Sequence, residues 1–384
     1  MRIQQVTIQG TDITPADVAP LASLQPHLVL VFASLEAMQA LDAACVQALI
    51  PQAQWVGCST AGEISGQGVY DGSIVLTALQ FDQPAFRVAS VALAGMADSQ
   101  AAGQRLATCL AHPDLRHVLV LGQGADINGS ALVDGLTGTL GSAVVVSGGL
   151  AGDGGRFTGA RVWGPDGISA TSVVGIGFDG PGWNISHGSM GGWQRFGPVR
   201  TVTRSAGNVL YELDGERALD IYKRYLGDYA AQLPASGLLF PWSVLGSDAQ
   251  AEGITRTLLG ISEADGSLIM AGDIPQGGKL QLMHASVDAL VDAAEQAAET
   301  ASQDAQATSD QAALALLVSC VGRKLVMGAR VDEEVEAVGQ MLGQHTTLAG
   351  FYSNGEISPH IHSTNCKLHN QTMTITLLSE RSAA

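Results

Sequence analysis

The chain has 384 residues, enough for two or three domains of ordinary size. Its 19 Lys and Arg residues and 36 Asp and Glu residues give a net charge of −17, which argues against a nucleic acid or an anionic membrane surface as the main partner. No apolar run approaches the roughly 20 residues that span a bilayer, and the start lacks the apolar segment of a signal peptide. Five widely spaced cysteines do not form a disulfide framework. We therefore expect a soluble cytoplasmic protein with a large core.

The first half of the chain repeats a pattern of alternating strands and helices. Short apolar runs predict buried strands, and a helical pattern follows each of the first strands. In each repeat a glycine-rich motif stands between the helix and a last apolar run. The predicted elements are strands at 28–33, 73–79, 118–121, 143–146 and 172–178, and helices at 35–50 and 130–140.

The second half begins differently and then returns to the same pattern. A pair of strands with a turn at Asp214-Gly215 is expected within 199–215, and a helix at 218–226 follows. We place the domain boundary near residue 206, which gives domains at 1–205 and 206–384. Further on, the predicted elements are helices at 285–301 and 332–342 and strands at 314–318 and 372–378.

The glycine motif is an internal repeat. Gly57-Cys-Ser-Thr-Ala-Gly-Glu-Ile-Ser65 recurs as Gly350-Phe-Tyr-Ser-Asn-Gly-Glu-Ile-Ser358, and a weaker copy covers Ser147–Asp153. The alternation predicts an α/β fold of two domains, built from duplicated strand–helix–strand–loop–strand units with buried sheets. We expect Gly57 and Gly350 to occupy equivalent positions. Ligands of such sheets usually bind at loops beyond the carboxyl ends of the strands, where the motifs are expected.

These motifs resemble the FIST family of bacterial sensory proteins, with an N-terminal and a C-terminal FIST domain over nearly the whole chain. The stretches at 208–215, 218–227 and 366–374 match the family as well. Ser186-His-Gly-Ser189, followed by Gly192-Trp193, is most similar to the nitric-oxide-sensing branch. That resemblance implies haem binding, uptake of a gaseous or other small ligand, and regulation of a partner histidine kinase or another signalling protein in biofilm control. It leaves a homo-oligomer open.

Enzyme motifs are missing from the sequence. It contains no Gly-x-Ser-x-Gly elbow, no Gly-x-x-x-x-Gly-Lys loop and no His-Glu-x-x-His pair. It also carries no recognisable kinase, cyclase or receiver domain. We therefore expect a sensor that is not an enzyme and whose output passes through a separate protein.

The paired glycine motifs provide the first candidate ligand site. Glycines let backbone amides face a ligand, while hydroxyl and carboxylate side chains add polar contacts. The alternative is structural, because a repeated strand-to-loop junction needs glycine and a carboxylate that bonds its own loop. The candidates are Gly57, Ser59, Thr60, Gly62, Glu63, Gly355, Glu356 and Asn370.

A second candidate site combines cysteine and histidine. Cys366 and His369 are three residues apart and can face one metal ion, and Cys58 lies in the paired motif. Thiolate and imidazole ligands suit zinc or an iron–sulfur cluster. The alternative is that Cys366 is a small buried hydrophobic residue and that His369 caps a loop.

For haem, the first candidate axial ligand is His187 and the second is His369. His187 lies in a glycine-containing stretch that we expect to be flexible, and Met190 and Trp193 could wall a pocket beside it. Three hypotheses therefore remain: a sensor of haem or another small ligand, a zinc or iron–sulfur protein, and a sensor of an amino-acid-like molecule that uses backbone amides with Glu63 or Glu356.

Overall fold

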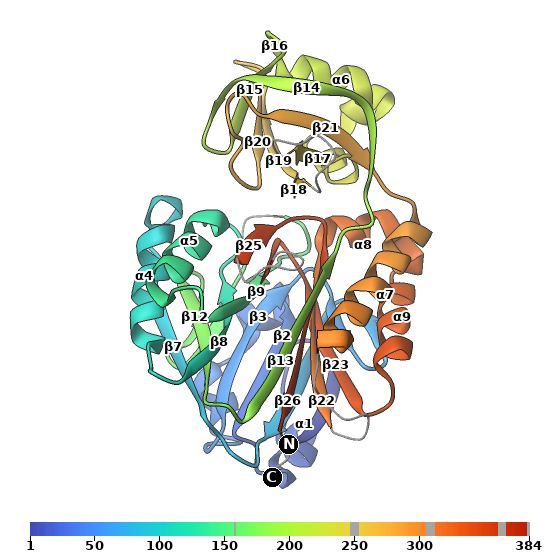
Figure 1. Ribbon diagram of the computed structural model, residues 1–384. Helices are drawn as coiled ribbons and strands as arrows, with labels where there is room; N and C mark the ends of the chain where they lie inside the picture. The colour runs from blue at the N-terminus through green and yellow to red at the C-terminus, as the bar shows by residue number, and fades with distance from the viewer. Residues whose placement is uncertain (157–158, 246–252, 305–311, 360–365, 382–384) are drawn as a thin grey trace.

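The computed structural model describes residues 1–156, 159–245, 253–304, 312–359 and 366–381. Figure 1 shows a larger body, made of sheets with helices outside them, and a smaller body above it. The larger body contains the first and the last strand of the chain, and the smaller one is formed by residues 194–245 and 253–284. In the described residues we find no helix that is long and apolar enough to cross a membrane. The α/β class predicted from the sequence is confirmed.

The larger body repeats one unit, with the chain order strand, helix, strand, helix, strand, hairpin, strand. The first unit comprises β1 (Arg2–Gln9), α1 (Pro15–Ser23), β2 (Leu28–Ser34), α2 (Leu35–Ala40), α3 (Ala43–Gln47), β3 (Gln54–Thr60), β4 (Glu63–Ser65), β5 (Gly68–Tyr70) and β6 (Ser73–Gln80). The second comprises β7 (Phe86–Ala92), α4 (Ser99–Leu110), β8 (Leu115–Gly122), α5 (Gly129–Leu140), β9 (Val145–Leu150), β10 (Val162–Gly164), β11 (Gly167–Ser169) and β12 (Ser172–Asp179). The third comprises β13 (Trp183–Met190), α7 (Val287–Asp304), β22 (Ala313–Cys320), α8 (Val321–Met327), α9 (Asp332–Leu342), β23 (Thr346–Ser353), β24 (Gly355–Pro359), β25 (Cys366–His369) and β26 (Met373–Glu380).

The units exchange their hairpins. Each sheet contains four strands of one unit and ends with the hairpin of another unit. The strand orders are β1-β6-β2-β3-β10-β11, β7-β12-β8-β9-β24-β25 and β13-β26-β22-β23-β4-β5. The second unit thus gives its hairpin to the first sheet, the third unit to the second sheet, and the first unit to the third sheet. This exchange closes the larger body into a ring, so no unit can leave without breaking strand pairs on both sides.

Each unit has a glycine at the same register position. In the third strand of the unit this glycine lies opposite a residue of the neighbouring parallel strand, so close that an added Cβ would meet the partner's carbonyl oxygen at 1.9 Å. The pairs are Gly57 with Val31, Gly148 with Val120, and Gly350 with Leu317. The predicted equivalence of Gly57 and Gly350 is therefore confirmed, and the weaker copy supplies the third glycine.

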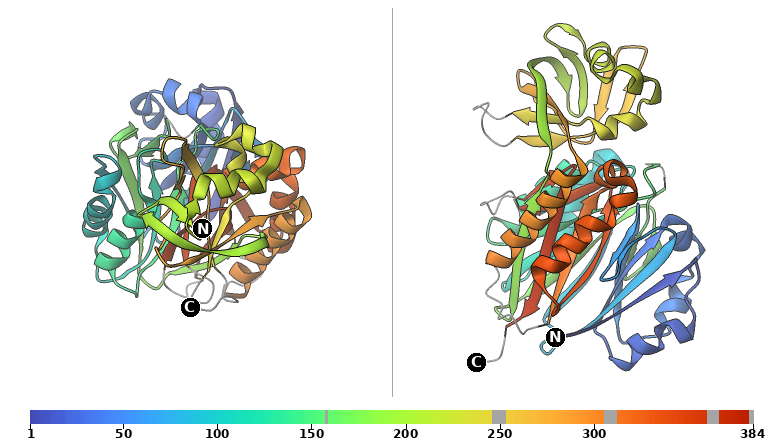
Figure 2. Two further views of the ribbon diagram at one scale, coloured as in Figure 1. Left: turned by 90° about the horizontal axis from the view of Figure 1, so that it is seen from above. Right: turned by 90° about the vertical axis from the view of Figure 1, so that its right-hand side faces the viewer.

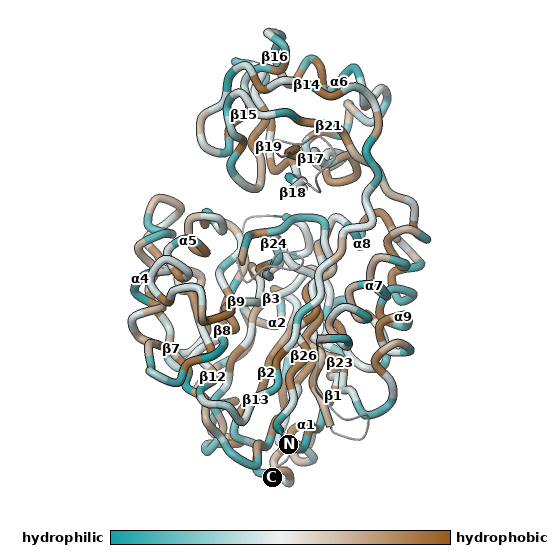
Figure 3. Tube along the Cα trace, in the orientation of Figure 1, coloured by the Kyte–Doolittle hydropathy of each residue, from teal (hydrophilic) through white to brown (hydrophobic). Residues whose placement is uncertain are grey.

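The inner faces of the sheets share one apolar core, and the helices cover the outer faces. Seen from above, the helices lie in groups around the edge of the larger body (Figure 2). The central strands are apolar on both faces because both faces are buried. The hydrophobic stretches accordingly follow these strands in Figure 3. The shared core includes Leu30 and Phe32 of β2, Leu119 and Leu121 of β8, and Leu316 and Val318 of β22.

Several predicted helices form as expected, and two segments differ. The helices at 218–226 and 332–342 are confirmed, and those at 130–140 and 285–301 are found with small shifts in their ends. The predicted helix at 35–50 is two helices, because Leu41 is extended and the Asp42 carboxylate caps the second one by accepting from the amides of Ala44 and Cys45. The stretch around His187, expected to be flexible, is strand β13 and pairs with β26 along its whole length.

The smaller body is inserted into the third unit between β13 and α7. Its sheet has the order β18-β17-β21-β14-β15-β20-β19, and β16 pairs with β15. The predicted turn at Asp214-Gly215 is present and joins β15 to β16, and both of its residues have positive φ. The boundary predicted between residues 205 and 206 falls at the end of β14. The elements are β14 (Gln194–Ala206), β15 (Val209–Leu213), β16 (Glu216–Arg217), α6 (Ala218–Leu226), β17 (Trp242–Leu245), β18 (Ile254–Arg256), β19 (Leu258–Ser262), β20 (Ser267–Met270) and β21 (Lys279–His284).

Candidate functional site

A cleft of about 420 Å³ lies where the smaller body meets the larger one. The larger body contributes the end of β13, one face of α7 and the turn between β25 and β26, and the smaller body contributes β14, β17, β18 and β21. Small-molecule sites typically have volumes of roughly 300–1,000 Å³ and often lie between domains. We refer to this space as the interdomain cleft.

Polar groups converge on the interdomain cleft from both bodies. Ser243 of β17 is 1% exposed, and its Oγ atom has no hydrogen-bond partner among the residues that the structure describes. Thr255 adds a second hydroxyl, and Arg195 adds a cation. A buried hydroxyl without a partner costs about 1–3 kcal/mol, so a ligand that bonds Ser243 recovers that free energy.

The apolar walls of the interdomain cleft are Met190, Met283 and Trp193. The Trp193 indole is fixed, because its Nε1 donates a 2.8 Å hydrogen bond to the carbonyl of Gln371. The sequence predicted that Trp193 walls a pocket beside His187; it walls the interdomain cleft instead. His187 does not share that pocket: it lies three residues before Met190 on β13 and lines a different cavity. Removal of its imidazole from solvent lowers the pKa of His187 to about 4.

His369, the second haem candidate, lines the interdomain cleft beside Thr372. It is the last residue of β25, and its Nε2 lies 3.1 Å from the carbonyl oxygen of Ser358 on the paired strand β24. The resulting contact fixes the plane of the imidazole. A backbone carbonyl is also the kind of second partner that metal-bound histidines use.

The predicted metal site of Cys58, Cys366 and His369 does not form. Cys58 lies in the core shared by the inner faces of the sheets, whereas Cys366 packs between the second sheet and its helices. Burial raises the pKa of both thiols. Nowhere in the described part of the chain do three His, Cys, Asp or Glu side chains gather as a group that could hold a metal ion. The two cysteines are separated because they lie on opposite faces of different sheets.

The carboxylates of the glycine motifs bond their own hairpins. Glu63 accepts from the hydroxyl of Thr60 and from both the amide and the hydroxyl of Ser73. Glu356 does the same with the hydroxyl of Ser353 (2.7 Å) and the amide and hydroxyl of Thr372 (3.1 and 3.0 Å). Neither carboxylate lines the interdomain cleft, but Thr372 does. Glu356 therefore reaches the cleft only through Thr372.

The other motif residues hold the repeated units together. Backbone hydrogen bonds link the motifs of different units. The amide of Ala61 donates to the carbonyl of Tyr352, that of Gly152 to the carbonyl of Ser59, and that of Asn354 to the carbonyl of Leu150. The Ser59 hydroxyl donates to the carbonyl of Gly152, and an added Cβ at Gly62 would meet the Lys324 side chain at 2.5 Å. Gly355 pairs with Leu150 of the second sheet. Asn370 is buried in the β25–β26 turn, where its Oδ1 has no hydrogen-bond partner within the described residues.

The buried carboxyl of Glu356 predicts a pH-dependent stability. Burial raises its pKa from 4.5 to about 7, although the bonds from Ser353 and Thr372 act in the opposite direction. The folded protein therefore holds a proton that the unfolded chain has lost, and the stability falls as the pH rises from about 4.5 to about 7. We expect Glu356→Gln to flatten this decline in the denaturation midpoint, while Glu336→Gln, at an exposed site on α9, leaves it unchanged. An equal decline in the wild type and Glu356→Gln would contradict this assignment.

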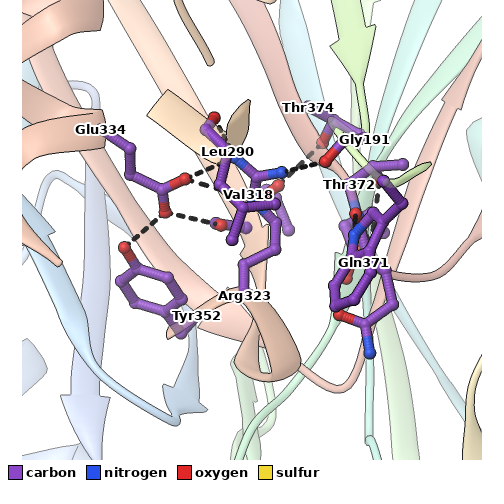
Figure 4. A network of polar contacts seen from close by, with 12 residues as sticks. Gly191, Leu290, Val318, Arg323, Glu334, Tyr352, Gln371, Thr372 and Thr374 are labelled. Carbon is purple, nitrogen blue, oxygen red and sulfur yellow. Dashed lines mark hydrogen bonds and ion pairs between the residues drawn. The ribbon is translucent and has the colours of Figure 1, made fainter. Parts of the chain in front are cut away.

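A buried ion pair, which we did not predict, fixes both connections between the bodies (Figure 4). Arg323 of α8 and Glu334 of α9 are fully buried and 2.6 Å apart. Arg323 also donates to the carbonyl of Gly191 (2.6 Å), just after β13, and to that of Leu290 (2.9 Å), in the first turn of α7. Glu334 accepts from Tyr352 in the glycine motif. The ion pair thus connects the ring to both segments that lead into the smaller body.

Two further bonds join the smaller body to the turn that carries His369. The Gln371 side chain donates to the carbonyl of Leu238 (2.8 Å), and Arg256 donates to the carbonyl of Leu368 (3.3 Å). Burial lowers the pKa of Arg256 to about 10, so it remains charged at neutral pH. The β25–β26 turn therefore contacts the smaller body at the edge of the interdomain cleft.

The fold and the interdomain cleft define an α/β protein with a ligand-sized pocket between its bodies. Residues 27–216 match the FIST N domain, and residues 218–359 match the FIST C domain. The chain therefore belongs to the FIST family, whose domains are sensory and bind small ligands in signalling. No curated protein sequence matches the chain. Among solved structures, a crystal structure of cyanuric acid hydrolase from A. caulinodans matches over 99% of each chain, with 10% sequence identity and a TM-score of 0.36, which is too low to bear on activity.

Proposed function

We propose that this protein is a sensor, not an enzyme, whose small ligand binds in the interdomain cleft and changes how the smaller body packs on the larger one. The observation that carries the proposal is the cleft itself, whose walls come from both bodies. A ligand that contacts both walls favours the arrangement in which the walls are close, and it shifts the population of arrangements accordingly.

Haem, held by His369, is the first ligand that we propose. The cleft offers an imidazole from His369, apolar walls from Met190, Met283 and Trp193, and a cation from Arg195 for a propionate group. His369 would hold the iron through its imidazole, whose plane is fixed by the contact between Nε2 and the carbonyl oxygen of Ser358. Bound haem would supply an iron that takes up nitric oxide. We prefer His369 to His187 because His369 shares a cavity with Trp193 and Met190.

An amino-acid-like molecule is the second candidate ligand, and the unpartnered Ser243 hydroxyl favours it. In this case Arg195 would bind a carboxylate, Ser243 and Thr255 would bond polar groups, and Met283 would pack against the apolar part. Glu63 and Glu356 would take no direct part, because both are occupied within their hairpins.

We propose that a partner histidine kinase responds to the position of the smaller body. The bonds from Arg323 to Gly191 and Leu290 hold both connections, so movement of the smaller body must act against this contact. Glu334 links the same contact to Tyr352 of the ring. Through these contacts, ligand binding in the cleft can affect the ring as well as the cleft walls.

Titration with haemin tests the first ligand. We expect the full-length wild type to give a Soret band and to respond spectrally to nitric oxide, and we expect His369→Gln to weaken haemin binding by about tenfold or more. His187→Gln and His345→Gln, the latter at an exposed site, serve as matched controls and are expected to bind like the wild type. Binding that is unchanged in His369→Gln would exclude His369 as the axial ligand. A folded wild type that binds no haemin would exclude haem and leave the amino-acid-like ligand.

A further inference from the structure

A second cavity lies at the opposite end of β13, away from the interdomain cleft. Its volume is about 460 Å³, and it lies at the start of β8, β9 and β13 and beyond the end of β26. Its lining includes the side chains of Arg116, His117, Trp183, His187 and Arg381. We call this space the basal cavity.

The basal cavity gathers two cations that no acidic residue of the described ranges pairs with. Of the arginines in the described ranges, only Arg116 and Arg381 have side chains with no hydrogen bond, ion pair or ring contact, and both line this cavity. The chain as a whole has a net charge of −17, so carboxylates are abundant elsewhere on the molecule. Two unpaired guanidinium groups at one cavity therefore point to an anionic ligand.

A pair of histidines adds neutral hydrogen-bonding groups beside these arginines. The rings of His117 and His187 are stacked, with their centroids 5.1 Å apart. His117 is 2% exposed; its Nε2 contacts the Ser147 hydroxyl at 3.1 Å, whereas its Nδ1 has no partner within the described residues. Such a buried ring nitrogen, on a side chain that lines the cavity, is available to a bound ligand.

The basal cavity adjoins the apolar core. A much smaller cavity of about 20 Å³ shares His117 and Ile185 with it and is otherwise lined mainly by leucines of the central strands, among them Leu119 and Leu316. That volume holds about one water-sized or methyl-sized group. The ligand should therefore combine an anionic group with a short apolar end.

We propose that the basal cavity binds a short-chain organic carboxylate, with the carboxylate between Arg116 and Arg381 and the apolar end directed past His117 toward the core. Guanidinium groups match the planar fork of a carboxylate. Binding here is independent of the proposed function of the interdomain cleft, because the two spaces share no lining residue.

Calorimetric titration of the full-length protein with butyrate tests this site. We expect saturable binding at millimolar concentrations and a loss of about tenfold or more in Arg116→Gln and in Arg381→Gln, because a charge-assisted hydrogen bond is lost in each. Lys279→Gln is the matched control: Lys279 is an exposed, unpaired cation on the smaller body, and its removal makes the same change in charge. Both arginines are exposed, so neither substitution affects the core.

Three results would overturn the proposal. One is the absence of saturable butyrate binding, and another is equal weakening in Lys279→Gln, which would mean that only the overall charge matters. The third is inorganic phosphate binding as tightly as butyrate, because an ion without an apolar end cannot use the small cavity. Butyrate binding that persists in His369→Gln would separate this site from the interdomain cleft, whereas its loss in that variant would contradict the independence of the two sites.

Discussion

Replacing Arg323 with methionine is expected to lower the free energy of unfolding by about 3–5 kcal/mol, because it leaves the Glu334 carboxylate buried without its counter-ion. The carbonyls of Gly191 and Leu290 lose their donor in the same step. Denaturant unfolding of the full-length protein measures the change. We also expect faster hydrogen exchange in the segments around these two carbonyls, which connect the bodies.

Arg330→Met is the matched control for this prediction. Arg330 pairs with Asp288 and Glu333 at the surface near the same helices, and exposed ion pairs contribute about 0–1 kcal/mol. The double variant Arg323→Met/Glu334→Met should be more stable than Arg323→Met alone, since no unpaired charge is left in the core. Similar small losses in Arg323→Met and Arg330→Met would contradict the structural role of the buried pair.

Adding a methyl group at the repeated glycine is expected to destabilise the ring strongly. In Gly350→Ala the new Cβ would lie 1.9 Å from the carbonyl oxygen of Leu317, which belongs to the backbone of the paired strand and cannot rotate away. A strand has to move instead, which costs about 3 kcal/mol or more. Gly57→Ala should behave alike, because Val31 presents its carbonyl at the same distance.

Gly138→Ala is the control for the glycine prediction. Gly138 lies on an exposed position of helix α5, and an added Cβ would meet nothing within 4 Å. This substitution should stabilise the protein by about 0.5–1 kcal/mol, as helix propensities indicate. Thermal or denaturant midpoints distinguish the two classes of variant. A mild effect at Gly57 or Gly350 would contradict the close approach of the paired backbones at that position.

The sequence predicted the repeated unit because its signals are local. Apolar runs mark β2, β8 and β22, and the motif identities align Gly57 with Gly350. The closed ring was not predicted, since the exchange of hairpins pairs strands that are far apart in the chain. Strand β13 was missed as well, because its small and polar residues read as a loop, and only pairing with β26 makes it a strand.

Three residues that the sequence analysis named separately lie at one cavity. Met190, Trp193 and His369 meet at the interdomain cleft, although nothing in the sequence indicates that the β25–β26 turn lies against the end of β13. Cys58 and Cys366 were grouped by motif similarity, which does not show the face of the sheet on which each side chain lies.

The buried ion pair and the unpaired arginines give no local signal. Arg323 and Glu334 lie on two successive helices, and only packing brings them together. Arg116 and Arg381 come from distant parts of the chain, and each is an ordinary polar residue at the end of a strand. Both features depend on contacts made across the ring.

Hydrogen exchange, measured by mass spectrometry on the full-length protein with and without ligand, shows whether a ligand binds between the two bodies. The probes are haemin and each of the twenty amino acids, and the wild type is compared with His369→Gln and with Ser243→Ala. We expect at least one probe to protect cleft segments of both bodies together, namely residues 189–195, 242–245, 283–296 and 369–372. Protection should weaken in the variant that removes the ligand's contact. A probe that binds the wild type and leaves these segments unprotected, or that protects only one body, would contradict a ligand site between the two bodies.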